Sequence, residues 1–174
     1  MASLISTLVR TAFGPRTDLL CNAETWRAGM AELRRRSGGY RESGAFLLGT
    51  KGRTRQINEF IYYDDIDPGA LSTGIVIIDG RNLGALWAHC RATKQEVVAD
   101  VHVHPYGFGQ STSDQANPII AEVGHKAIII PDYARKATRP GTIGVYELLG
   151  SRRWRDDSRR WFSPLHIGWW PGWR

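Results

Sequence analysis

His102 and His104 lie two residues apart in the segment EVVADVHVH (96–104). Its alternation of apolar and polar residues predicts a β-strand, in which residues two apart point to the same face. We expect one face to carry Val97, Ala99, Val101 and Val103 and the other to carry Asp100, His102 and His104. Neutral imidazole is a common zinc ligand, so two on one face suggest a metal site. Taken alone, the pair also fits two ordinary histidines at a strand end.

Asp114 supplies a third candidate ligand. It follows the glycine-rich loop YGFGQST (106–112), at the expected start of a helix over about 113–123. Such a loop can return the helix start to the end of the strand. Two histidines and one carboxylate leave a tetrahedral zinc with one open position, as catalytic sites require. Ser113 or Asp114 would also suit the N-cap of this helix, which is the alternative role for Asp114.

Ser111 and Glu42 are the candidate groups that would act on a substrate. Ser111 stands three residues before Asp114, where its hydroxyl could donate to an oxygen that becomes negative during acyl transfer. A serine in a turn is the simpler explanation of Ser111 by itself. Glu42 precedes an apolar strand predicted over 43–50, and alone it would count as a surface acid.

Together these residues resemble a known motif. The pattern H-x-H-P-x5-S-x2-D is formed by His102, His104, Pro105, Ser111 and Asp114. It resembles the JAMM (MPN+) metalloprotease motif, with the short spacing of the prokaryotic branch. Glu42, followed by SGAFLLG, is similar to the upstream glutamate of that family. The resemblance covers about residues 24–149, and it departs at Val103, a position that binds no metal.

The resemblance implies a zinc metallopeptidase with one Zn²⁺ per chain. The ion would be held by His102, His104 and Asp114, with water as its fourth ligand. Glu42 would take the proton of that water as general base and deliver it to the departing amine. Ser111 would stabilise the oxyanion.

The resemblance also implies a substrate class. Family members cleave after the C-terminal glycine of ubiquitin-like proteins, either to detach them from targets or to process precursors. The short spacing is similar to bacterial members that accompany E1-like and E2-like partners in antiphage defence. A glycine-rich tail would add as a strand beside the sheet. We expect Ile66, Leu71 and Trp87 either to contact the body of the modifier or to pack in the core.

Three alternatives remain open at the level of sequence. One is a peptidase for sulfur-carrier proteins or small cysteinyl adducts, and another is a catalytically silent scaffold of the same fold. The formal net charge of +6 also fits a nucleic-acid-binding module. No helix-turn-helix, zinc-finger or RNA-binding signature accompanies that charge, so we do not expect a nucleic-acid partner.

The predicted elements describe a mixed α/β domain with helices against a central sheet. Besides the segments above, helices are expected over 22–36 and 81–93 and strands over 53–63, 74–79, 126–131 and 142–149. A loop is expected over 64–73, and a hairpin over 151–162 that turns at 156–158. The resemblance adds a partly curved mixed sheet of the MPN/JAMM type. We expect one domain over 1–174, with the motifs in 24–149 and a tryptophan-rich hairpin or tail over 150–174.

The remaining features bear on location and partners. No run approaches the roughly 20 apolar residues of a membrane helix, and the N-terminus does not resemble a signal peptide. The two cysteines, Cys21 and Cys90, form no disulfide framework, which favours a cytoplasmic protein. Trp169, Trp170 and Trp173 either cap the core or form a partner surface.

Overall fold

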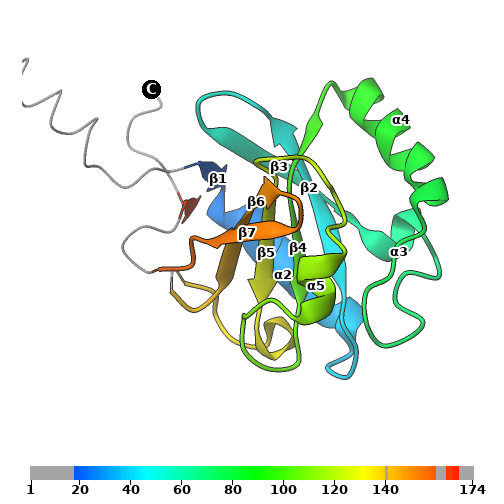
Figure 1. Cartoon of the computed structure of the whole chain (residues 1–174), viewed down its shortest axis with the longest axis vertical. Coiled ribbons are helices and arrows are strands. Elements are labelled where there is room, and N and C mark those ends of the chain that lie inside the picture. The colour runs from blue at the N-terminus through cyan, green and yellow to red at the C-terminus, as the bar shows by residue number, and fades with distance from the viewer. Residues whose placement is uncertain (1–17, 140, 160–163, 169–174) are drawn as a thin grey trace, which may run out of the picture.

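The computed structural model describes residues 18–139, 141–159 and 164–168. Its strands are β1 (Leu19–Cys21), β2 (Gly44–Thr50), β3 (Arg55–Tyr62), β4 (Glu96–Val103), β5 (Lys126–Ile130), β6 (Gly144–Gly150), β7 (Arg153–Asp156) and β8 (Leu165–Ile167). They form one curled eight-stranded sheet in the order β7-β6-β5-β4-β2-β3-β1-β8 (Figure 1). Parallel pairs (β1 with β3, β1 with β8, β4 with β5) and antiparallel pairs both occur. The predicted mixed α/β class is therefore confirmed.

The helices are α2 (Ala23–Ser37), α3 (Tyr63–Ile66), α4 (Gly84–Thr93) and α5 (Thr112–Ala116), with 3₁₀ turns η1 (Gly80–Leu83) and η2 (Asp132–Ala134). Asn22 caps α2 by accepting a 2.7 Å hydrogen bond from the backbone N–H of Glu24. Gly38 ends α2 in the left-handed conformation, which glycine adopts without strain. The helix predicted over 22–36 is thus confirmed. No helix in the described part of the chain is long and apolar enough to span a membrane.

Two hydrophobic clusters bury the two faces of the sheet. On one face, Trp26, Met30 and Leu33 of α2 pack against strand residues that include Leu47 and Val101. On the other face, Leu86 and Cys90 of α4 pack with Phe46, Leu48 and Tyr63. Each fully buried large apolar side chain contributes about 1.5–3 kcal/mol. Because both faces are covered, a polar side chain on a central strand is removed from water.

The strand β4 lies in the middle of the sheet, between β2 and β5, and its residues after Glu96 are buried. Val98 belongs to the cluster on the α2 face, whereas Val97 belongs to the opposite cluster. The pairing of β2 with β4 shifts between Leu47 and Leu48, which inserts one extra residue in β4. The predicted alternation is therefore correct from Ala99 onward and wrong for Val97.

The strand predicted over 74–79 is wrong. The segment belongs to no strand, and Ile75 and Ile77 are 47% and 55% exposed. Its apolar composition is typical of a buried strand, but the segment, which connects α3 to η1, lies outside the sheet. The helix expected over 81–93 is present as η1 followed by α4. The loop expected over 64–73 opens with the last residues of the short helix α3.

The hairpin at the C-terminal side turns earlier than predicted. Ser151 and Arg152, with φ of 51° and 59°, make the turn between β6 and β7. Positive φ at both central residues is the turn geometry that matches the twist of a hairpin. The turn predicted at 156–158 is wrong because the Ser158 hydroxyl accepts a hydrogen bond from the Val145 backbone, which keeps this segment against β6. Trp169, Trp170 and Trp173 lie outside the described residues.

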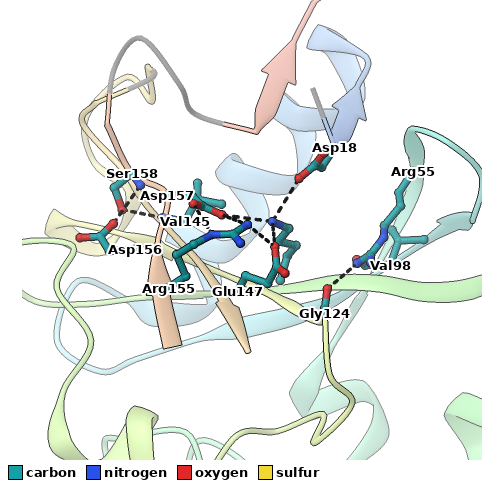
Figure 2. A network of polar contacts seen from close by, with 11 residues as sticks. Asp18, Arg55, Val98, Gly124, Val145, Glu147, Arg155, Asp156, Asp157 and Ser158 are labelled. Atoms are coloured by element: carbon teal, nitrogen blue, oxygen red, sulfur yellow. Dashed lines mark hydrogen bonds and ion pairs between the residues drawn. The ribbon is translucent and has the colours of Figure 1, made fainter. Parts of the chain in front are cut away.

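Lys126 is a buried cation at the start of β5, with 2% of its side chain exposed. Its Nζ lies 2.5 Å from Glu147 Oε2 and 3.2 Å from carboxylate oxygens of Asp18 and Asp157 (Figure 2). Arg155 contacts the same Glu147 and Asp157 carboxylates. This charge cluster joins the start of β1, strand β5 and the hairpin β6–β7.

Candidate metal centre

His102 lies near the end of β4 and His104 directly follows the strand; both are buried, with side chains 7% and 10% exposed. His102 is in register with Gly44 of β2 and Ile129 of β5, so sheet pairing fixes its backbone on both sides. The backbone N–H of His104 donates to the Ile130 carbonyl, and its carbonyl accepts from Tyr133 N–H, both at 2.9 Å. The ladder of the sheet therefore positions both imidazoles.

The turn η2 that holds the His104 carbonyl is strained. Asp132, Tyr133 and Ala134 all have positive φ, at 55°, 52° and 57°. Such conformations cost non-glycine residues of the order of 1–3 kcal/mol each and cluster at functional sites. The strain here accompanies the hydrogen bond that fixes His104.

Asp114 reaches the histidines from α5, which differs from the predicted helix. α5 covers only Thr112–Ala116, so the prediction of a helix over 113–123 is wrong in its length. The N-cap is Ser111, rather than Ser113 or Asp114, and Asp114 sits at the third helical position. The Ser111 hydroxyl accepts from Asp114 N–H at 3.1 Å, and Asp114 Oδ2 accepts from Ser111 N–H at 2.6 Å. This capping box fixes the carboxylate.

The three side chains converge, and we call them the His–His–Asp group (His102, His104 and Asp114). The two Nε2 atoms are 2.9 Å apart. Asp114 Oδ1 lies 3.5 Å from Nε2 of His102, and Oδ2 lies 3.3 Å from Nε2 of His104. Ligands about 2.0–2.1 Å from a tetrahedral zinc ion are roughly 3.3 Å from one another. The donor set and its spacing therefore fit a zinc ion.

Electrostatics within the group also favour a cation. Burial alone would lower the pKa of His102, but its hydrogen bond to Asp114 and the charges of Asp114, Asp100 and Glu42 raise it above its ordinary value. Burial would raise the pKa of Asp114, yet its contacts with both histidines hold that pKa well below its usual range. The carboxylate therefore stays anionic, and a bound metal would replace a proton on the histidines.

Glu42 lies beside the group but is more distant than the ligands. Its Oε1 is 3.7 Å from Nε2 of His104, and its side chain is 16% exposed. Its Oε2 accepts a hydrogen bond from the Val76 backbone N–H at 3.2 Å, and its own N–H donates to the Gly74 carbonyl at 2.9 Å. The segment 74–79, mispredicted as a strand, thus holds the carboxylate at the edge of the group. A carboxylate held there can accept a proton from a water bound to a metal.

Ser111 lies next to the group with a hydroxyl proton still available. Its oxygen accepts the Asp114 N–H, as an N-cap does, and this contact leaves the O–H free to donate. The structure thus brings all five predicted residues to one place: Glu42, His102, His104, Ser111 and Asp114.

Asp100 is not the solvated strand residue that its type suggests. It is 3% exposed, and it accepts a hydrogen bond from the Tyr63 hydroxyl at 3.1 Å and contacts His125 Nε2 at 2.6 Å. Sequence reasoning missed Tyr63 and His125, which stand 37 and 25 residues from Asp100. The one available signal was a charged residue within an otherwise apolar strand.

The surface expected to meet a partner is only partly exposed. Leu71 is 2% exposed and packs with Leu86, so for this residue the core alternative holds. Trp87 is 39% exposed, and Ile66 is partly buried against the same cluster. On either side of Val76, whose backbone contacts Glu42, the side chains of Ile75 and Ile77 are exposed.

No protein-family model matches the chain. The fold is similar to that of a Desulfitobacterium hafniense protein solved in solution, with a TM-score of 0.61 and 14% identity over 86% of this chain and 92% of that one. It is also similar to a Salinibacter ruber protein solved in solution, with a TM-score of 0.50 and 18% identity over 82% of this chain and 89% of that one. At these identities the likeness shows the fold alone.

Proposed function

We propose that this chain is a zinc metallopeptidase of the JAMM type that cleaves the amide bond after the C-terminal glycine of a ubiquitin-like protein. The observation that carries the proposal is the position of Glu42, 3.7 Å from His104 Nε2 beside three ligand-type side chains. A structural metal site needs no such base. A hydrolytic site needs one, together with a coordination position open to water.

In this proposal each residue has one task. The zinc ion, when bound, supplies Lewis acidity that activates water and polarises a carbonyl group. Glu42 accepts a proton from the attacking water and returns it to the departing amine. Ser111 donates its free O–H to the oxygen that becomes negative. The bond that breaks joins the carbonyl carbon of the glycine to the amine nitrogen.

The segment 74–79 gives the proposal a place for the substrate tail. It holds Glu42 through Val76, it lies outside the sheet, and it exposes Ile75 and Ile77. An extended glycine-rich tail that bonds along this backbone would lead its terminal carbonyl toward Glu42. Glycines suit such a position because they allow close approach of two backbones.

The biological setting is what the resemblance to the bacterial branch of the family implies, and we propose it together with the activity. We propose that the enzyme serves a bacterial ubiquitin-like conjugation system with E1-like and E2-like partners, in antiphage defence. There it would detach the modifier from its target or process its precursor. A sulfur-carrier protein, which the same resemblance allows, is the second candidate substrate.

The test uses a ubiquitin-like protein fused through its terminal glycine to a reporter. Wild-type protein loaded with zinc should release the reporter, whereas Glu42→Gln should lose about 10²–10⁴-fold of the rate. Glu24→Gln is the matched control, since Glu24 is an exposed acid at the start of α2. Cleavage that survives in Glu42→Gln or after chelation would contradict the proposal, as would zinc-loaded protein that cleaves no ubiquitin-like or sulfur-carrier fusion.

A further inference from the structure

Asp100 is a charged side chain in the most deeply buried part of the sheet. It lies in β4, in register with Phe46 of β2 and Ala127 of β5. A carboxylate in such surroundings is unfavourable unless it is hydrogen-bonded. Even a well-paired buried charge is often less stabilising than an apolar side chain of similar size. A carboxylate at this position therefore indicates a role other than packing.

Both oxygens of Asp100 are held by other elements. The Tyr63 hydroxyl donates to Oδ2, and Nε2 of His125 lies 2.6 Å from Oδ1. Tyr63 is fully buried, and His125 is 4% exposed. His125 is itself fixed, because its N–H donates to the Glu122 carbonyl and its carbonyl accepts from Leu148 N–H. A proton on Nε2 of His125 would give both oxygens a hydrogen-bond donor, as a carboxylate anion requires.

This network adjoins the His–His–Asp group. Asp100 and His102 are two residues apart on one strand, so their side chains share a face at about 7 Å. Tyr63 packs on Gly44, the register partner of His102: a Cβ at Gly44 would lie 2.1 Å from Cε2 of the tyrosine. Tyr63 thus contacts both the Asp100 carboxylate and the backbone beside a metal ligand.

His102 lacks the direct support that metal-binding histidines usually have. Such histidines donate their second ring N–H to a carboxylate or carbonyl. Nδ1 of His102 is buried and has no hydrogen-bond partner. Support for a cation at this ligand must therefore act without a hydrogen bond to Nδ1.

We propose that Asp100 is a positioning residue that supplies a second buried anion to the metal centre. The Asp100 carboxylate, held by Tyr63 and His125, would stabilise the cation electrostatically from the position next to His102 on the same face of β4. The inference rests on the metal site of the proposed function, and it is independent of the substrate.

The test is zinc affinity, measured by competition with a chromophoric chelator and requiring no substrate. Asp100→Asn keeps the shape and removes the charge, so zinc should bind about 10–100-fold more weakly. Tyr63→Phe removes one hydrogen bond but leaves the charge, and it should lose less than about fivefold. Asp157→Asn is the matched control, since it removes a partly buried carboxylate from the Lys126 cluster on the opposite face. Its affinity should match that of wild type.

Unfolding curves recorded without metal show that each variant is folded before zinc is added. The absorption spectrum of bound Co²⁺ should show four-coordinate metal in wild type, Tyr63→Phe and Asp100→Asn alike, because no ligand has been removed. Zinc affinity of Asp100→Asn within about twofold of wild type would overturn the inference. Equal losses in Asp100→Asn and Tyr63→Phe would also overturn it, because packing rather than charge would then be responsible. Wild-type protein that binds no zinc would overturn the metal site itself.

Discussion

Replacing Lys126 by methionine tests how much the charge cluster around Lys126 stabilises the fold, where it joins the start of β1 to β5 and the hairpin β6–β7. Lys126→Met keeps an unbranched chain of similar length and removes the ammonium group. Its three acidic neighbours, Asp18, Glu147 and Asp157, have side chains 26%, 19% and 18% exposed. They would then face one another with only the half-exposed Arg155 to balance Glu147 and Asp157.

The expected cost follows from the burial of the ammonium group. Removing one partner of a buried ion pair usually costs about 3–5 kcal/mol. We expect the lower end, about 3 kcal/mol, because the carboxylates keep some contact with water and Arg155 remains. For a chain of this size that corresponds to a fall in Tm of roughly 6–12 °C. Lys136→Met is the control: Lys136 pairs with Asp132 but is 78% exposed, so its loss should cost only about 0–1 kcal/mol.

The pH dependence of the Lys126→Met effect provides a second check. Burial would raise the pKa of Asp157, but Arg155 and Lys126 outweigh burial and lower that pKa below its ordinary 3.8. The stabilisation from this lowered pKa is present above about pH 4 and is lost as the pH falls through the folded-state value. The difference between wild type and variant, measured by urea unfolding, should therefore shrink on acidification. A difference below about 1 kcal/mol at pH 7, or one that grows as the pH falls, would refute this reasoning.

Three further predictions concern the site, a surface acid and the thiols. Ser111→Ala should lower turnover about 10²–10³-fold while zinc affinity stays near that of wild type, and unchanged turnover of a cleavable fusion would exclude the oxyanion role. Glu32→Gln should lower the free energy of unfolding by up to about 1 kcal/mol at pH 7. Hydrogen bonds from Arg35 and Arg36 outweigh the effect of burial and lower the pKa of Glu32 from 4.5 to about 2. That cost should vanish between pH 4.5 and pH 2 in unfolding experiments, and a cost that persists at pH 2 would contradict the assignment. Neither cysteine should react with a thiol reagent at pH 8 until the protein unfolds, since burial raises the pKa of Cys21 to about 12 and that of Cys90 above its usual value; rapid labelling of folded protein would count against this.

The parts of the fold that follow from local pattern were predictable. The helix over 22–36 has a capping asparagine, an apolar stripe and a terminal glycine, all within one segment. The end of β4 alternates cleanly, and that alternation places His102 and His104 side by side. The requirement for glycine at position 44, two residues after Glu42, is explained only by the fold, because Tyr63 occupies the space that a Cβ at Gly44 would need.

The errors arise where distant contacts decide the structure. The segment 74–79 has the composition of a buried strand, yet no strand pairs with it and its backbone holds Glu42. α5 ends at Ala116, two residues before Pro118, whereas the helix was predicted to continue to about residue 123. The burial of Asp100 depends on contacts with Tyr63 and His125, which are remote from it in sequence. No local pattern reports such contacts.

The metal content of the purified protein tests the central claim most directly. After dialysis against dilute zinc and removal of excess metal, elemental analysis should give one zinc per chain. His104→Ala and Asp114→Asn should lose it, whereas Glu42→Gln should retain it because Glu42 lies outside the ligand set. Zinc that is absent from wild type, or that is kept by His104→Ala and Asp114→Asn at full stoichiometry, would contradict the account.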